Sequence, residues 1–127
     1  MELPRDVDVL ILEDNPTLLE LVLCNMPQRI IVSCAETSEE LKEFLEQERR
    51  AKLYFLDDQV PGKKGRAPDY KFMYHSRLVL EKTPEAKLFY IGSTPDARVR
   101  SYCLEKGIEI IERRKINDKI RQLLLSS

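Results

Sequence analysis

Short apolar runs alternate with longer segments of helical periodicity, and this alternation repeats about five times without a linker or a low-complexity break. Four of the runs are almost continuously apolar, as expected of strands that helices cover on both faces. The pattern predicts an α/β fold with a buried parallel sheet and right-handed crossovers. The predicted strands are Val7–Leu12, Ile30–Cys34, Leu53–Leu56, Lys87–Ile91 and Ile108–Ile111.

The segments between the runs carry signals for helix starts and ends. Asn15 followed by Pro16 is typical of an N-cap and a first helical position, and the segment 37–40 (Thr-Ser-Glu-Glu) is typical of a capping box. Thr94 before Pro95 predicts the start of another helix. A third helix is expected over about 69–82, and Gly107 is expected to end the fourth. The last helix has an apolar stripe of Ile116, Ile120, Leu123 and Leu124.

The length and charge of the chain limit its organisation and its partners. A length of 127 residues is typical of one domain, so we predict a single domain over residues 1–127. The 21 Lys and Arg residues nearly balance the 22 Asp and Glu residues, which leaves a net charge of -1. Because proteins that follow a phosphate backbone normally carry a basic excess, we expect no direct binding of nucleic acid.

The number and spacing of the cysteine, histidine and apolar residues exclude further classes of protein. The three cysteines stand at long spacings without a C-x-x-C pair, which favours neither a disulfide framework nor a zinc ribbon. No window approaches 18 apolar residues, and the N-terminus has no apolar signal region, so we expect a cytoplasmic protein without membrane contact. The single histidine, His75, gives little material for a His-based metal site or a Ser-His-Asp triad, and we expect it to be structural or exposed.

Acidic pairs directly follow two of the predicted strands. Glu13 and Asp14 follow the first strand, and Asp57 and Asp58 follow the third. Either pair alone could be a solvated loop or a helix N-terminal charge. In an open parallel sheet, however, ligands bind beyond the carboxyl ends of the strands. If the two strands are neighbours, the carboxylates converge and need a cation or a proton to offset their repulsion, and Mg²⁺ suits such oxygen ligands.

Three segments together resemble the receiver domain of two-component response regulators, the family of the chemotaxis response regulator. Residues 10–16 (Leu-Ile-Leu-Glu-Asp-Asn-Pro) resemble its first-strand motif. Residues 55–65 resemble its phospho-acceptor motif, in which a proline, here Pro61, follows the aspartate by four positions. Residues 35–41 resemble its second strand-to-helix junction. The resemblance implies a flavodoxin-like, doubly wound (βα)5 fold with a five-stranded parallel sheet of order 2-1-3-4-5.

The resemblance also implies roles for individual residues. Asp57 would be the phosphorylated aspartate, Asp14 a direct Mg²⁺ ligand, and Glu13 a partner carboxylate that acts directly or through water. The backbone carbonyl of Gln59 would be a third ligand. Asp58 would be a bystander whose side chain points away from Asp57, because neighbouring side chains alternate across a strand.

The chain departs from the family pattern after the fourth and fifth strands. Ser93 is the expected hydroxyl that hydrogen-bonds the phosphoryl group. The family has a lysine followed by a proline after the fifth strand, whereas here Arg114 is expected in the lysine position, or Lys115 with a shift of one residue. The aromatic residue of the family's fifth strand is missing. The chain is also about six residues longer than the family pattern near 66–72. This insertion beside the site could be a partner-specific contact or only a longer loop, and we expect the loop.

The leading hypothesis is a phospho-accepting receiver that takes a phosphoryl group on Asp57 from a histidine kinase or a phosphotransfer protein and signals to a downstream protein target. Such a chain is not an enzyme beyond Mg²⁺-dependent phosphorylation and dephosphorylation of itself. The alternative is a degenerate pseudo-receiver that works as a phosphorylation-independent interaction module. A third hypothesis, a true Mg²⁺ enzyme, is the weakest because the chain lacks the D-x-D pattern after either strand.

Overall fold

The computed structural model describes residues 6–92 and 94–125. Its main sheet has five parallel strands in the order β2-β1-β3-β6-β7, which confirms the predicted order 2-1-3-4-5. These strands are β1 (Asp6–Leu12), β2 (Val32–Ala35), β3 (Arg50–Asp57), β6 (Lys87–Ile91) and β7 (Glu109–Ile111). The helices are α1 (Pro16–Cys24), α2 (Ser38–Glu46), α3 (Phe72–Lys82), α4 (Ala97–Lys106) and α5 (Ile116–Leu124), with a short 3₁₀ turn η1 (Arg113–Lys115) before α5.

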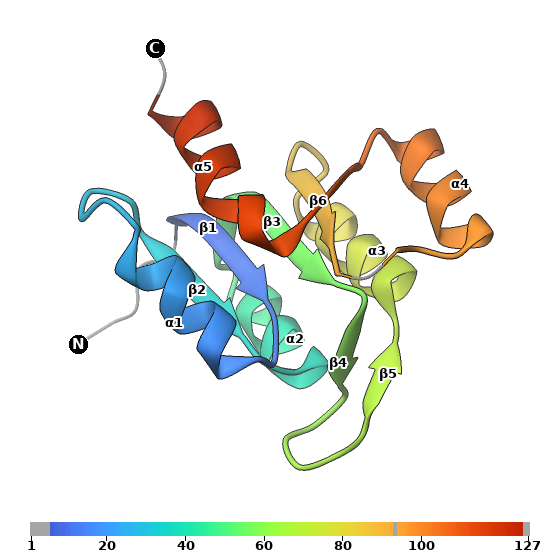
Figure 1. Cartoon of the computed structure of the whole chain (residues 1–127). Helices are drawn as coiled ribbons and strands as arrows, with labels where there is room; N and C mark the ends of the chain where they lie inside the picture. The colour runs from blue at the N-terminus through green and yellow to red at the C-terminus, as the bar shows by residue number, and fades with distance from the viewer. Residues whose placement is uncertain (1–5, 93, 126–127) are drawn as a thin grey trace.

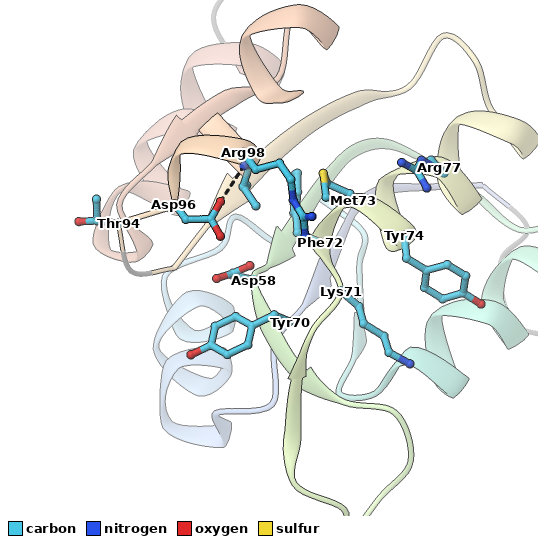
Figure 2. Close-up of a pocket in the computed structure, with 11 residues that line it drawn as sticks. Asp58, Tyr70, Lys71, Phe72, Met73, Tyr74, Arg77, Thr94, Asp96 and Arg98 are labelled. Atoms are coloured by element: carbon cyan, nitrogen blue, oxygen red, sulfur yellow. Dashed lines mark hydrogen bonds between the residues drawn. The ribbon is translucent and has the colours of Figure 1, made fainter. Parts of the chain in front are cut away.

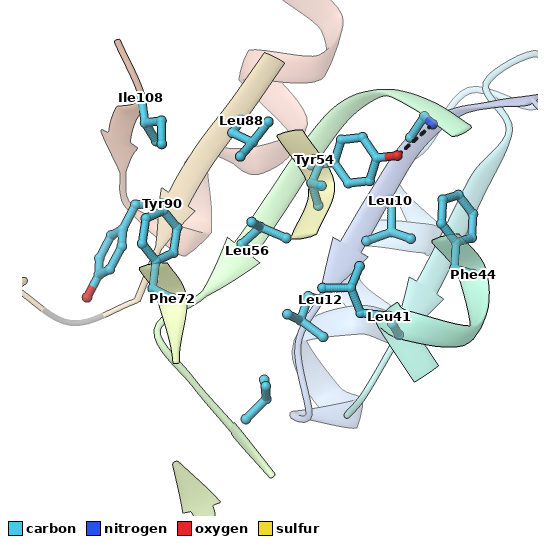
Figure 3. Packing of buried hydrophobic residues seen from close by; sticks show 14 of the residues in the cluster. Leu10, Leu12, Leu41, Phe44, Tyr54, Leu56, Phe72, Leu88, Tyr90 and Ile108 are labelled. Atoms are coloured by element: carbon cyan, nitrogen blue, oxygen red, sulfur yellow. Dashed lines mark hydrogen bonds between the residues drawn. The ribbon is translucent and has the colours of Figure 1, made fainter. Parts of the chain in front are cut away.

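Two apolar cores lie on the two faces of this sheet (Figure 1). Alternate residues of each strand point to opposite faces, so Leu10 and Leu12 join one core whereas Val9 and Ile11 join the other. Helices α2, α3 and α4 cover the first core, which Figure 3 shows from close by, and α1 and α5 cover the second. Both faces of the sheet are therefore buried, and the polar residues at the strand ends are left to form a site at its edge.

Helix caps fix the chain where it leaves the first two strands. The side chain of Asn15 accepts hydrogen bonds from the backbone N–H groups of Thr17 and Leu18, which confirms the predicted N-cap of α1. The Thr37 hydroxyl accepts from the N–H of Glu40, which confirms the predicted start of α2. These caps satisfy N–H groups that the first turn of a helix leaves without partners.

The start of α4 differs from the prediction. Thr94 is not the N-cap, because Asp96 takes this position and its carboxylate accepts from the N–H of Val99 at 2.9 Å. An ionised carboxylate is a stronger acceptor than a hydroxyl, and Pro95 separates the two candidates without an N–H of its own. The helix ends as predicted at Gly107, which is left-handed with φ of 71°.

The expected long loop near 66–72 contributes one strand to a small antiparallel hairpin. Strands β4 (Gln59–Pro61) and β5 (Pro68–Tyr70) pair with each other in a separate two-stranded sheet. The predicted helix over about 69–82 is therefore too long at its start, and α3 begins only at Phe72. Pro68 lacks a backbone N–H, so it is tolerated on such an edge strand and marks the end of the loop. In Figure 1 the hairpin extends away from the main sheet.

No helix in the described part of the chain is long and apolar enough to span a bilayer.

Candidate functional site at the ends of β1 and β3

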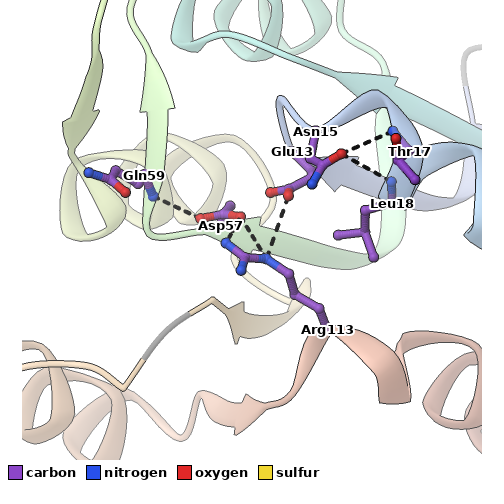
Figure 4. Close-up of polar contacts among 7 residues, drawn as sticks. All are labelled: Glu13, Asn15, Thr17, Leu18, Asp57, Gln59 and Arg113. Atoms are coloured by element: carbon purple, nitrogen blue, oxygen red, sulfur yellow. Dashed lines mark hydrogen bonds and ion pairs between the residues drawn. The ribbon is translucent and has the colours of Figure 1, made fainter.

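Two buried carboxyl groups meet at the carboxyl ends of the central strands. Asp57 is the last residue of β3, and Glu13 directly follows β1, which pairs with β3 in parallel up to Leu12 and Leu56. Only 1% of Asp57 and 2% of Glu13 is exposed. The sequence placed both residues at this edge, and the adjacency of β1 and β3 brings them to the same cation, as Figure 4 shows.

That cation is the guanidinium of Arg113. Its Nη2 lies 2.7 Å and its Nε 3.2 Å from Oδ2 of Asp57, and its Nε lies 3.5 Å from Oε1 of Glu13. The prediction that Arg114 would face Asp57 is wrong, since Arg114 pairs with Glu112 on the surface. Lys115 is also exposed. The 3₁₀ turn η1 begins at Arg113, directly after the residue that follows β7, and this geometry points Arg113 back across the strand ends.

The charges of this cluster depend on one another. Burial, followed by the neighbouring Asp57 carboxyl group, raises the pKa of Glu13 from 4.5 to about 9. Burial by itself would lower the pKa of Arg113, but its hydrogen bond to Asp57 and the charges of Asp57, Glu13 and Asp14 raise it instead. The guanidinium is therefore firmly charged and faces the charge of Asp57, whereas the raised pKa of Glu13 keeps that carboxyl group protonated at neutral pH.

Asp14 and Gln59 lie at the borders of the cluster. Asp14 is half-buried, and its charge raises the pKa values of both Glu13 and Arg113. The backbone N–H of Gln59 donates to Oδ1 of Asp57 at 2.9 Å. Both oxygens of Asp57 thus have a partner, one in the backbone at the start of β4 and the other in Arg113.

The arrangement does not form a site for Mg²⁺ with the side chains in these positions. Across residues 6–92 and 94–125, no group of three or more His, Cys, Asp or Glu side chains is placed to hold a metal ion. Oε2 of Glu13 is buried without a hydrogen-bond partner, so one acceptor is free, but Arg113 lies between the two carboxyl groups. Mg²⁺ requires a nearly octahedral set of oxygens, and this cluster presents a guanidinium instead.

Asp58 lies beside a groove that is separate from this cluster. The groove has a volume of about 490 Å³, and it opens between the start of α3 and the start of α4 (Figure 2). The pKa of Asp58 is raised, mainly by burial, and a hydrogen bond with Tyr90 reduces the size of this increase. Tyr70, at the end of the hairpin, also lines the groove and is largely exposed. The sequence contained no signal for this groove, because its walls come mainly from the starts of α3 and α4, which are far apart in the sequence.

Of the two hydroxyl residues that follow Gly92, the structure describes only Thr94. Ser93, the expected partner of the phosphoryl group, lies outside the described residues. Thr94 is exposed and lines the groove beside Asp58.

Gly92 is a further site residue, and the sequence analysis assigned it no role. Its φ is 142°, in a region that residues with side chains rarely adopt. A Cβ atom at this position would lie 3.5 Å from Oδ1 of Asp57 and 3.5 Å from Cβ of Asp58. Both distances are ordinary van der Waals contacts, so the positive φ, and not a lack of space beside Asp57, is the reason that glycine is favoured at this position.

We expect Gly92→Ala to lower the free energy of unfolding by about 1–3 kcal/mol, the usual cost of such a strained backbone. Urea unfolding measures the change. Gly62→Ala is the matched control, because Gly62 does not have a positive φ and has open space around its Cβ position, so its stability should change little. Equal losses in the two variants would contradict the role of the backbone conformation at Gly92.

Solved structures with the same fold include receiver domains and response regulators. The chain matches RcsB from Salmonella typhimurium, a response regulator studied for its DNA interaction, with a TM-score of 0.68 and 17% identity over 96% of this chain and 59% of that one. It matches the non-phosphorylated receiver domain of RcsB from Escherichia coli with a TM-score of 0.69 and 18% identity, over 94% of this chain and 91% of that domain.

A third match is a response regulator from Burkholderia pseudomallei, whose structure contains a phosphorylated aspartic acid and a calcium ion. Its TM-score is 0.71 at 14% identity, over 94% of this chain and 66% of that one. The chain thus spans less than two thirds of two of these three proteins. No protein-family model and no curated protein matches the sequence. At these identities the comparisons show a shared receiver fold.

Proposed function

We propose that this chain is a phospho-accepting receiver, a single domain that takes a phosphoryl group on Asp57 and signals through contacts with other proteins. The observation that carries the proposal is the position of Asp57. Its buried carboxyl group ends a central strand, is oriented by the N–H of Gln59, and contacts a charged guanidinium through Oδ2. Phosphoryl transfer depends mainly on positioning and on neutralising charge, and these groups supply both.

Arg113 is the cation that this proposal assigns to the phosphoryl oxygens. Before transfer it pairs with Asp57, and after transfer the new oxygens extend from the same carboxylate towards the same guanidinium. A planar guanidinium binds phosphate through two parallel N–H donors, whereas the lysine of the family is a compact point charge. The chain therefore replaces one type of phosphate ligand with another rather than losing the cation.

The partners follow from this chemistry. The proposal requires a phosphoryl donor, either a histidine kinase or a phosphotransfer protein, and a protein target that distinguishes the two states of the chain. We infer a cytoplasmic location, where such donors act. Asp57 would take the phosphoryl group from the donor, which is left dephosphorylated, and hydrolysis would later release this group as inorganic phosphate; the chain would convert no further substrate.

One observation favours a second candidate function, the pseudo-receiver that works as an interaction module without phosphorylation. Asp57 is 1% exposed, and both of its oxygens already have partners. A phosphodonor can reach Oδ2 only if the side chain of Arg113 moves aside. If Arg113 does not move, the buried ion pair holds the strand ends in one fixed conformation.

The test is incubation with acetyl phosphate, with and without MgCl2, followed by intact mass spectrometry. We expect the mass to increase by one phosphoryl group. No increase in either arm, under conditions in which the receiver domain of Escherichia coli RcsB is modified, would reject phosphoryl acceptance and leave the interaction module. The arm without MgCl2 shows whether the chain's own cation is sufficient.

A further inference from the structure

Arg113 contacts both carboxyl groups that the sequence analysis assigned to a divalent ion. Its Nη2 is 2.7 Å from Oδ2 of Asp57, and its Nε is 3.5 Å from Oε1 of Glu13. Figure 4 shows the guanidinium beside these two side chains, at the end of the sheet where they converge. The position between neighbouring strand ends is thus held by a positive charge that is part of the chain.

The buried pair of Asp57 and Glu13 by itself has too few free oxygens to hold an ion while Arg113 stays there. Oδ1 of Asp57 accepts from the backbone of Gln59, and Oδ2 accepts from Arg113. In the described part of the chain, Oε2 of Glu13 is the one carboxyl oxygen of this buried pair without a partner. A cation that prefers six oxygens at about 2.1 Å and a guanidinium 2.7 Å from the same carboxylate would also repel each other.

The side chain of Arg113 can nevertheless move out of this position. Its side chain is 41% exposed, whereas the side chains of Asp57 and Glu13 are 1% and 2% exposed. It belongs to a turn of three residues, so its movement does not require a sheet strand to shift.

We propose that Arg113 is a built-in counter-cation that takes the place of a divalent ion beside Asp57 and Glu13. The resting site is then neutralised without metal, and a divalent ion binds only by displacing the arginine. This inference rests on the same site as the proposed function, and its test needs no phosphodonor.

Binding of Mg²⁺ to the wild type, Arg113→Ala and Arg114→Ala tests the inference. MgCl2 alone is titrated at constant ionic strength, and the amide NMR signals of Glu13 and Gln59 report binding. Because displacement of an ion pair opposes binding only when Arg113 is present, Arg113→Ala should bind Mg²⁺ at least about tenfold more tightly than the wild type. Arg114→Ala removes the same charge one residue away, from an arginine that pairs outside the site, and it should bind like the wild type.

Equal or weaker binding by folded Arg113→Ala would overturn the proposal, as would an equal gain in both variants, which would indicate a general effect of net charge. If Arg113→Ala does not fold, the wild type provides a second measurement. The Nε–H signal of Arg113 should move towards that of free guanidinium groups as Mg²⁺ saturates the signals of Glu13 and Gln59. If these two signals saturate while the Arg113 signal stays in place, the ion and the guanidinium coexist and the proposal fails.

Discussion

Asp57→Asn is expected to give no phosphoryl adduct with acetyl phosphate, whereas Asp58→Asn is expected to be modified like the wild type. An amide at position 57 is a poor nucleophile, and it also removes the charge that pairs with Arg113. Asp58 is the matched control because it is the next residue, has the same side chain and faces the groove near α3 and α4 instead of the Arg113 cluster. Intact mass spectrometry measures both variants.

The alternative outcomes of this experiment identify different errors. An adduct on Asp57→Asn that disappears in Asp58→Asn would place the acceptor in the groove. An adduct on both variants would show that acetyl phosphate modifies the chain elsewhere. We expect Asp57→Asn to fold, because Glu13 still pairs with Arg113 in that variant. Circular dichroism and a cooperative urea transition check that a missing adduct does not result from unfolding.

The second large effect concerns acid stability and a histidine outside the site. His75 is completely buried in α3, and its Nε2 lies 2.6 Å from Oγ of Ser38 at the start of α2. Burial, followed by the charge of Lys71, lowers the pKa of His75 from 6.5 to about 4. Its Nδ1 has no hydrogen-bond partner among the residues described, so a second proton would be buried without an acceptor.

Acidification should therefore destabilise the chain through His75. Below pH 6.5 the unfolded chain gains a proton at this residue that the folded chain does not bind until about pH 4. The stability linked to His75 is complete above pH 6.5, and about 3 kcal/mol is lost as the pH falls to 4. Urea unfolding of the wild type and His75→Gln across this range measures the difference.

The comparison uses the slope of the unfolding free energy against pH. The substitution His75→Gln can also change this free energy by a constant amount, which does not affect the slope. Glutamine keeps a hydrogen-bonding group near Ser38 but does not titrate. Other titrating groups, including Glu13, contribute equally to both proteins and cancel in the difference. Parallel pH curves for the two proteins would show that His75 is not held neutral.

The sheet and its acidic edge could be predicted because they depend on local patterns. Uninterrupted apolar runs identify buried strands, and the residue after such a run must lie at the sheet edge. Glu13 and Asp57 were found in this way, and the parallel pairing of β1 with β3 brings them together. The N-caps at Asn15 and Thr37 were found by the same kind of reasoning, since a cap involves only three or four neighbouring residues.

The cation could not be predicted, because its position in the sequence does not determine the backbone geometry after the fifth strand. The sequence Arg113-Arg114-Lys115 offers three consecutive cations, and which of them faces Asp57 depends on how the chain turns after β7. Here a 3₁₀ turn begins at Arg113, and three residues per turn direct successive side chains about a third of a turn apart. An error of one residue in this position therefore moves the charged group from the buried site to the surface.

The separate pairing of β4 with β5 has a consequence for how the site can diversify. The ladder of this hairpin is closed within itself, so its length is not tied to the register of any strand in the main sheet. Residues can be inserted or lost at its tip without a slip of β3, and so without moving Asp57. The fold thus separates the position of Asp57 from an adjoining segment whose length and charge can change independently.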